Sequence, residues 1–178
     1  MTRESVGLPT RRDQGTQMLD KFEWPQPEDK RDEIIIRNVR QHGCHIVGIN
    51  GDEKGPGYAF SIGLFVNYGQ AEVVIFGFEG RVAARIINYV RDCAAEGQKF
   101  VAGDVCDDIL ADYKVCFVEV PLEAYRSYLG TAIWFYLKSP RPFPCLQIVW
   151  PDREGRFPWQ TGYDADLKDL QPLLKSIS

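Results

Sequence analysis

The sequence predicts a single α+β domain: a mainly antiparallel sheet of about five strands, packed against one long helix and flanked by shorter helices. Short apolar runs rich in β-branched and aromatic residues recur between turns marked by glycine and proline, which is typical of strands. One segment, about Gly80 to Glu96, instead carries its apolar residues at helical spacing. The 178 residues, 44% of them apolar, suffice for one hydrophobic core.

Residues 1–27 are predicted to form a polar arm, flexible or docked, ahead of a domain covering residues 28–178. The arm ends in Trp24-Pro25-Gln26-Pro27, and prolines at this spacing disfavour a helix. Phe22 and Trp24 offer aromatic area that would be stabilised by burial against the domain.

The first half of the domain predicts a helix followed by three strands. The helix should run from about Glu28 to Gln41, because Ile34, Ile35 and Val39 form an apolar stripe. The turn-rich stretch 50–57 lacks phosphate-binding spacing and is predicted to be a surface loop. The two strands after it are expected to form an antiparallel meander. The predicted strands are Cys44–Ile49, Tyr58–Phe65 and Glu72–Phe78.

The second half predicts two further strands, Val115–Val120 and Cys145–Trp150. Between them, Leu122–Tyr136 has helical spacing interrupted by Gly130, so one bent helix or two short helices are expected. After Trp150 the chain should turn and return as a hairpin that ends at Trp159, and a last short helix is expected within residues 164–174.

Composition argues against several classes of function. A formal charge of −4 and a pI of about 5.3 do not fit a protein that neutralises many phosphates, so nucleic acid is not an expected partner. The five cysteines are odd in number and widely spaced, which is typical of reduced thiols in a cytoplasmic protein. The N-terminal residues lack the apolar stretch of a secretory signal, and no apolar run is long enough to span a bilayer. A cytoplasmic protein that does not bind membranes is expected.

Several strings match a known pattern in their order and separations. They are His42-Gly43, Tyr58-Ala59-Phe60-Ser61-Ile62-Gly63-Leu64, Ala71-Glu72, Gly77, Tyr128, Ile133-Trp134-Phe135-Tyr136, Gln147-Ile148-Val149-Trp150-Pro151-Asp152, Gly155-Arg156-Phe157-Pro158-Trp159 and Gln171-Pro172-Leu173-Leu174. With these strings, the chain resembles the bacterial domain-of-unknown-function family 4262 over about residues 34–174. The resemblance is most specific in residues 150–159, and it implies no established activity.

The chain departs from that family's usual pattern at three places. Members usually carry a tryptophan where this chain has Cys44, and often a Tyr-Thr pair where it has Phe60-Ser61. They usually carry His-Pro-Glu where it has Gln70-Ala71-Glu72. Chemistry that depended on that histidine in relatives is therefore not available to this chain.

No set of residues in the sequence compels a metal site or a reaction, and no cofactor is predicted. His42, Cys44 and His45 are a close group of soft ligands, but Cys44 and His45 should point to opposite faces of a strand. Ser61 lacks the first glycine of a nucleophile elbow. Glu72 and Asp152 remain, with Ser61, as weak catalytic candidates, and Glu72 would be the base if its neighbours desolvate it.

The segment Trp150–Trp159 combines aromatic, basic and acidic side chains around a tight turn, a composition found where proteins bind other molecules. It is equally typical of a hairpin whose tryptophans cover the end of the core while Asp152 caps the turn and pairs with Arg156. The residues expected to bind a ligand or partner are Tyr58, Ser61, Trp150, Asp152, Arg156 and Trp159.

These observations favour a non-catalytic binding domain that engages another protein, such as an immunity or regulatory protein. The alternative hypothesis is a small enzyme, or a domain that senses a small molecule, with its cleft between residues 58–63 and 150–159. The sequence assigns no oligomeric state.

Overall fold

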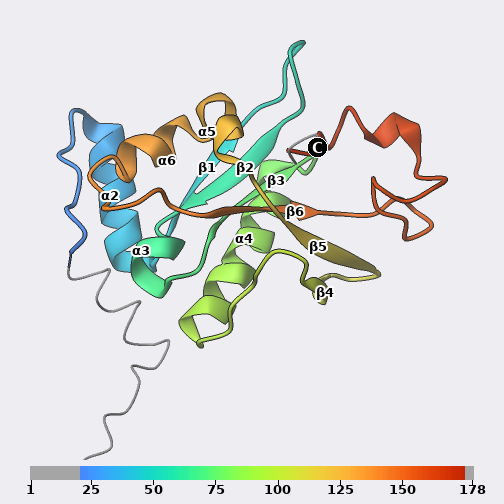
Figure 1. Ribbon diagram of the computed structural model, residues 1–178. Helices are drawn as coiled ribbons and strands as arrows, with labels where there is room; N and C mark the ends of the chain where they lie inside the picture. The colour runs from blue at the N-terminus through green and yellow to red at the C-terminus, as the bar shows by residue number, and fades with distance from the viewer. Residues whose placement is uncertain (1–20, 175–178) are drawn as a thin grey trace, which may run out of the picture.

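The computed structural model describes residues 21–174, which form one α+β domain around a six-stranded mixed sheet (Figure 1). The strand order is β1-β2-β3-β6-β5-β4, and neighbouring strands are antiparallel except for the parallel pair β3 and β6. The strands are β1 (His45–Ile49), β2 (Tyr58–Ile62), β3 (Glu72–Phe76), β4 (Val105–Leu110), β5 (Tyr113–Glu119) and β6 (Cys145–Val149). The expectation of an α+β domain is confirmed, with a mixed sheet of one strand more than expected.

Helices lie on both faces of this sheet rather than mainly on one. They are α2 (Lys30–His42), α3 (Leu64–Tyr68), α4 (Gly80–Ala95), α5 (Leu122–Tyr128) and α6 (Gly130–Phe135), followed by a 3₁₀ helix η1 (Ala165–Leu167). In Figure 1, α4 crosses the sheet on one side, whereas α2, α5 and α6 lie together away from it. The helical stretch broken by Gly130 is thus two short helices.

Strand β3 shows why both faces need a helical cover. Val73 and Ile75 pack into the cluster that contains α4, while Val74 and Phe76 pack into the cluster formed with α2, α5 and α6. Successive side chains of a strand point to opposite faces, so an unbroken apolar run requires two apolar environments. This places the site-bearing strands β2, β3 and β6 at the centre of a three-layer arrangement.

Helix α2 has clear local reasons for its limits. The carboxylate of Asp29 accepts the Asp32 N–H at 2.9 Å, which caps the first turn. Gly43 ends the helix in the left-handed region, with φ 83°. Ile35 and Val39 are fully buried, and each burial stabilises the domain by roughly 2 kcal/mol.

Two elements were not predicted from the sequence. The predicted strand Tyr58–Phe65 ends at Ile62, because Gly63 adopts φ 112° and turns the chain into the five-residue helix α3. Strand β4 was missed because it is an edge strand: Asp107 and Asp108 are exposed and its pairing with β5 is interrupted by a bulge. An edge strand of this kind lacks the apolar alternation by which strands are recognised.

The two ends of the described chain are fastened to the domain. Phe22 stacks on Phe135 with ring centroids 5.5 Å apart, and Trp24 meets the same ring edge-on at 5.7 Å. The rest of the predicted arm, residues 1–20, lies outside the described residues. At the other end, Gln147 of β6 donates to the Pro172 carbonyl and accepts the Leu174 N–H, at 2.8 and 2.9 Å. Within residues 21–174 no helix has the length and apolar character needed to cross a membrane.

The turn at Gly63 is predicted to be sensitive to a single methyl group. A Cβ at this residue would lie 2.6 Å from Val39 Cγ1 and 3.1 Å from the Gly43 carbonyl oxygen. Gly63→Ala should therefore lower the free energy of unfolding by about 3 kcal/mol, measured by urea denaturation. Gly97 has φ 92° with open space around it, so Gly97→Ala should cost only about 1 kcal/mol of backbone strain. Equal losses for the two variants would contradict the predicted steric clash.

Candidate functional site

Glu72 opens strand β3, yet its carboxylate is buried, with 1% of the residue exposed. The side chain accepts four hydrogen bonds: from Ser61 Oγ at 2.5 Å, the Gly63 N–H at 2.8 Å, the Phe65 N–H at 3.1 Å and the Tyr136 hydroxyl at 2.5 Å. These donors come from β2, the turn after it, α3 and the residue that follows α6. Glu72 therefore joins four segments at one buried point.

Burial raises the pKa of Glu72 above its ordinary value of 4.5, although the four hydrogen bonds act in the opposite direction. Ser61 is equally committed, because its Oγ also accepts the Val73 N–H at 2.9 Å. A general base must come within hydrogen-bond reach of a substrate proton. The structure brings the candidates Ser61 and Glu72 together, but in the interior rather than at a surface.

Cys44, His42 and His45 have different surroundings. Burial, followed by the charge of Glu72, raises the pKa of the Cys44 thiol to about 12, which keeps it protonated at neutral pH. His45 Nδ1 lies 3.0 Å from Asn38 Nδ2, while His42 is exposed at the end of α2. Within residues 21–174, no three histidine, cysteine or acidic side chains are grouped so that they could hold a metal ion.

Gln70 stands where members of the resembled family usually carry a histidine. Its amide is 1% exposed and is bonded in both directions to one residue: Nε2 donates to the Phe100 carbonyl at 3.1 Å, and Oε1 accepts the Phe100 N–H at 2.9 Å. The amide thus behaves as an extra strand residue that holds the chain after α4. At this position the Gln70 side chain therefore has a structural role, because it joins the segment before β3 to the backbone of Phe100.

Asp152 organises the turn that follows β6. Its carboxylate, in a residue 2% exposed, accepts the N–H groups of Glu154, Arg156 and Asp164 at 2.9, 2.9 and 3.2 Å, and the Arg156 Nε at 2.9 Å. Burial alone raises the pKa of Asp152, but these hydrogen bonds outweigh it and leave the pKa below its ordinary value of 3.8. Asp152 and Arg156 therefore cap and pair within the turn.

The two tryptophans of this segment differ in role. The Trp150 Nε1–H donates to the Phe76 carbonyl at 2.9 Å, and its backbone exchanges two 2.8 Å hydrogen bonds with the Gln171 side chain. Trp159 is 50% exposed and stacks on Phe157 with ring centroids 5.0 Å apart. Residues 157–159 form no strand, so the predicted return of a hairpin is wrong; the carboxylate of Asp152 turns the chain instead.

A surface groove of about 770 Å³ lies at the opposite end of β2 from Ser61. Tyr58 lines it together with Tyr128, whose ring centroid is 5.6 Å away, and the Tyr58 hydroxyl donates to the Tyr128 carbonyl at 3.1 Å. The remaining walls come from residues 49–56 and 168–172.

Of the six residues predicted to bind, Tyr58 is the one that lines this groove. Apart from Tyr58, no residue of the expected cleft between 58–63 and 150–159 lines this groove, and residues 168–172 form its second wall. Sequence reasoning missed Tyr128 and the C-terminal wall as groove residues. The aromatic pattern singled out Tyr128, but its closeness to Tyr58, seventy residues earlier, is a tertiary contact with no sequence spacing to reveal it.

One protein-family model matches the chain. A family model described as "Domain of unknown function (DUF4262)" matches residues 38–164, more than half of the chain. The chain belongs to this family. The match runs from the last residues of α2 to the turn held by Asp152, and so includes Glu72, Tyr58 and Tyr128 but ends before the C-terminal wall of the groove. No curated protein and no solved structure matched the chain in the other two comparisons.

The four donors around Glu72 predict a difference between two substitutions at this position. Glu72→Ala deprives all four backbone and hydroxyl donors of this acceptor in the interior and should lower the free energy of unfolding by about 4 kcal/mol. Glu72→Gln keeps an acceptor for the Gly63, Phe65 and Tyr136 donors and places its NH₂ toward Ser61 Oγ, so about 1 kcal/mol is expected. Denaturation of both, with the exposed Glu79→Ala as control, checks this. If Glu72→Gln were as damaging as Glu72→Ala, the charge rather than the acceptors would be required.

The lowered pKa of Asp152 predicts how the turn responds to acid. A carboxyl group whose pKa is lower in the folded than in the unfolded state stabilises the fold above its unfolded pKa, and that contribution disappears as the pH falls through the folded value. Asp152→Asn should therefore be less stable than the unsubstituted protein at pH 7, and the difference should shrink below about pH 3.8. Thermal unfolding across pH tests this, with the exposed Asp107→Asn as the matched control. A difference that stayed constant with pH would contradict the proposed charge contribution.

Proposed function

We propose that this protein is a non-catalytic binding domain that holds an extended segment of a partner protein in the groove lined by Tyr58 and Tyr128. The observation that carries the proposal is the groove itself: it contains two neighbouring aromatic rings, and its lining comes from three separate parts of the chain. Tyrosine is one of the residue types enriched among the few side chains that supply most of the binding energy between proteins.

The rim of the groove suits an amphipathic polypeptide segment. Ile49 and Leu170 expose 39% and 47% of their surface there, and Pro56 and Pro172 add rigid apolar area. The charged rim residues carry both signs: Asp52, Glu53, Lys54, Lys168 and Asp169. A segment with alternating apolar and charged side chains meets such a surface without burying an unpaired charge.

The polar groups that an enzyme would need are engaged in the fold, which supports binding over catalysis. Glu72 and Ser61 bond to each other and to neighbouring segments, and Asp152 holds its own turn. None of the three lines the groove of Tyr58. The competing enzyme hypothesis requires these side chains to face one shared cleft.

We also propose that the domain acts in the bacterial cytoplasm. All five cysteines are free thiols, which suits the reducing cytoplasm of a bacterial cell. There the protein would serve as an immunity or regulatory protein, whose partner is engaged by contact rather than by chemical change.

Site-specific cross-linking in the native host tests the proposal. A photoreactive amino acid at the exposed rim residue Ser127 should trap one protein that the same group at the exposed residue Arg81, on α4, does not trap. The trapped protein, purified and titrated against the domain, should bind at least tenfold more weakly to Leu170→Asp, because a charge enters the apolar rim.

The matched control is Leu137→Asp, which places the same charge on another exposed leucine that does not line the groove. Its dissociation constant should equal that of the unsubstituted domain. Identical cross-links from residues 127 and 81, or equal weakening by both aspartates, would rule out the groove as the binding surface.

A further inference from the structure

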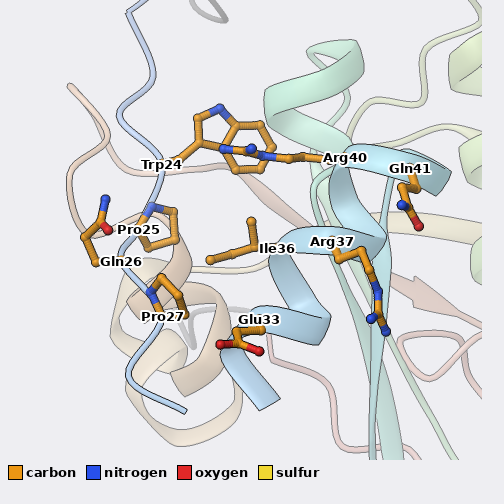
Figure 2. A pocket seen from close by; sticks show the side chains of 9 residues that line it. All are labelled: Trp24, Pro25, Gln26, Pro27, Glu33, Ile36, Arg37, Arg40 and Gln41. Atoms are coloured by element: carbon orange, nitrogen blue, oxygen red, sulfur yellow. The ribbon is translucent and has the colours of Figure 1, made fainter. Parts of the chain in front are cut away.

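The arm and helix α2 line a second groove, of about 430 Å³, on a different part of the surface (Figure 2). Trp24, Pro25 and Pro27 form its arm side, and Ile36 points toward them from the helix. Its volume lies in the range of small-molecule sites. The groove has no part in the function proposed above, and either proposal stands without the other.

The arm side of this groove is held in place. Trp24 packs edge-on against Phe22 and Phe135, with ring centroids 5.4 and 5.7 Å away. Pro25 is buried, and Glu23 forms an ion pair with Lys138. The proline rings fix two backbone angles of the short wall between Trp24 and the helix. A groove with such walls exists before a ligand arrives, which lowers the entropic cost of binding.

The groove runs along one face of α2. At one end the chain turns at Asp29 from the arm into α2. At the other end the Arg40 guanidinium lies across the Trp24 ring, 4.4 Å from its centroid, and links the helix to the arm. The groove is open to solvent along its length, and its volume matches a small ligand.

Arg40 offers unused hydrogen-bond donors at one end of the groove. Among residues 21–174, its guanidinium forms neither an ion pair nor a hydrogen bond, and its contact is with the Trp24 ring. The N–H donors at the edge of the guanidinium group remain available, in the fork geometry that matches a carboxylate. Arg37 also lines the groove, but its guanidinium is directed away from the arm (Figure 2).

Glu33, at the opposite end of the groove from Arg40, restricts the charge that a ligand can carry there. Glu33 lies on the same helical face as Ile36 and Arg40, because residues three, four and seven positions apart share a face. Its carboxylate has no partner among the described residues. A ligand with a negative charge at both ends would be repelled there. From these contacts we propose that the groove binds a small organic monocarboxylate, with its carboxylate on Arg40 and its apolar body against Ile36 and the two prolines.

The test is a titration of the full-length protein with hexanoate, hexanamide and adipate, followed by ¹H–¹⁵N NMR at the Trp24 indole N–H. That signal is assigned by its loss in Trp24→Phe. Hexanoate should shift it in a saturable manner, and hexanamide and adipate should each bind at least about fivefold more weakly. A Trp24 signal that does not respond to hexanoate, or equal binding of hexanoate and hexanamide, would overturn the proposal.

Arg40→Gln should reduce hexanoate binding to the level of hexanamide, whereas Arg40→Lys, which keeps the charge but loses the fork, should fall between. Arg81→Gln on the exposed face of α4 is the matched control and should bind hexanoate as the unsubstituted protein does. The dispersed NMR spectrum of each variant reports whether it is folded. Unchanged hexanoate binding by a folded Arg40→Gln variant would overturn the assignment of Arg40.

Discussion

The buried carboxylate of Glu72 is the contact on which most of the architecture depends. It gathers donors from β2, the turn at Gly63, α3 and Tyr136, and so fixes where β3 enters the sheet relative to the helices on one face. Desolvating an acidic side chain is costly, and the cost is offset here by a full set of donors rather than by a counter-ion. Because β3 also pairs with both β2 and β6, an error at this point would be transmitted through the centre of the sheet.

Sequence patterns sufficed for the elements long enough to repeat a buried apolar face, and failed for a very short helix and an exposed edge strand. Helix α4 and strands β2, β3 and β6 were located to within a few residues because their spacing records the packing. The five residues of α3 are too few to display a period, and β4 exposes its acids at an edge. For the site, residue type alone could not separate Trp150 and Asp152, which are held inside by hydrogen bonds, from Trp159, which is not. Tyr58 was singled out, but the walls that give it a groove come from distant parts of the chain.

The two grooves share a principle of construction. In each, a rigid aromatic group anchored to the core stands beside chain segments that are not part of the sheet: Tyr58 beside residues 50–56 and 168–172, and Trp24 beside α2. The sheet and its buried networks thus set the positions of the aromatic rings, while polar side chains at the rims set the chemistry. Substitution at the rims can change what is recognised with little effect on the core.

The C-terminal segment is held by the side-chain amides of two glutamines. Gln147 and Gln171 tie residues 171–174 to β6 by side-chain amides that imitate a neighbouring strand, with each amide both donating and accepting. An amide does not titrate, and its bonds are weakly screened by salt, unlike those of a carboxylate. Uncharged hydrogen bonds therefore hold the segment behind Leu170 and Pro172. This wall of the Tyr58 groove should keep its position at pH values and salt concentrations that weaken the contacts of the Asp152 carboxylate in the neighbouring turn.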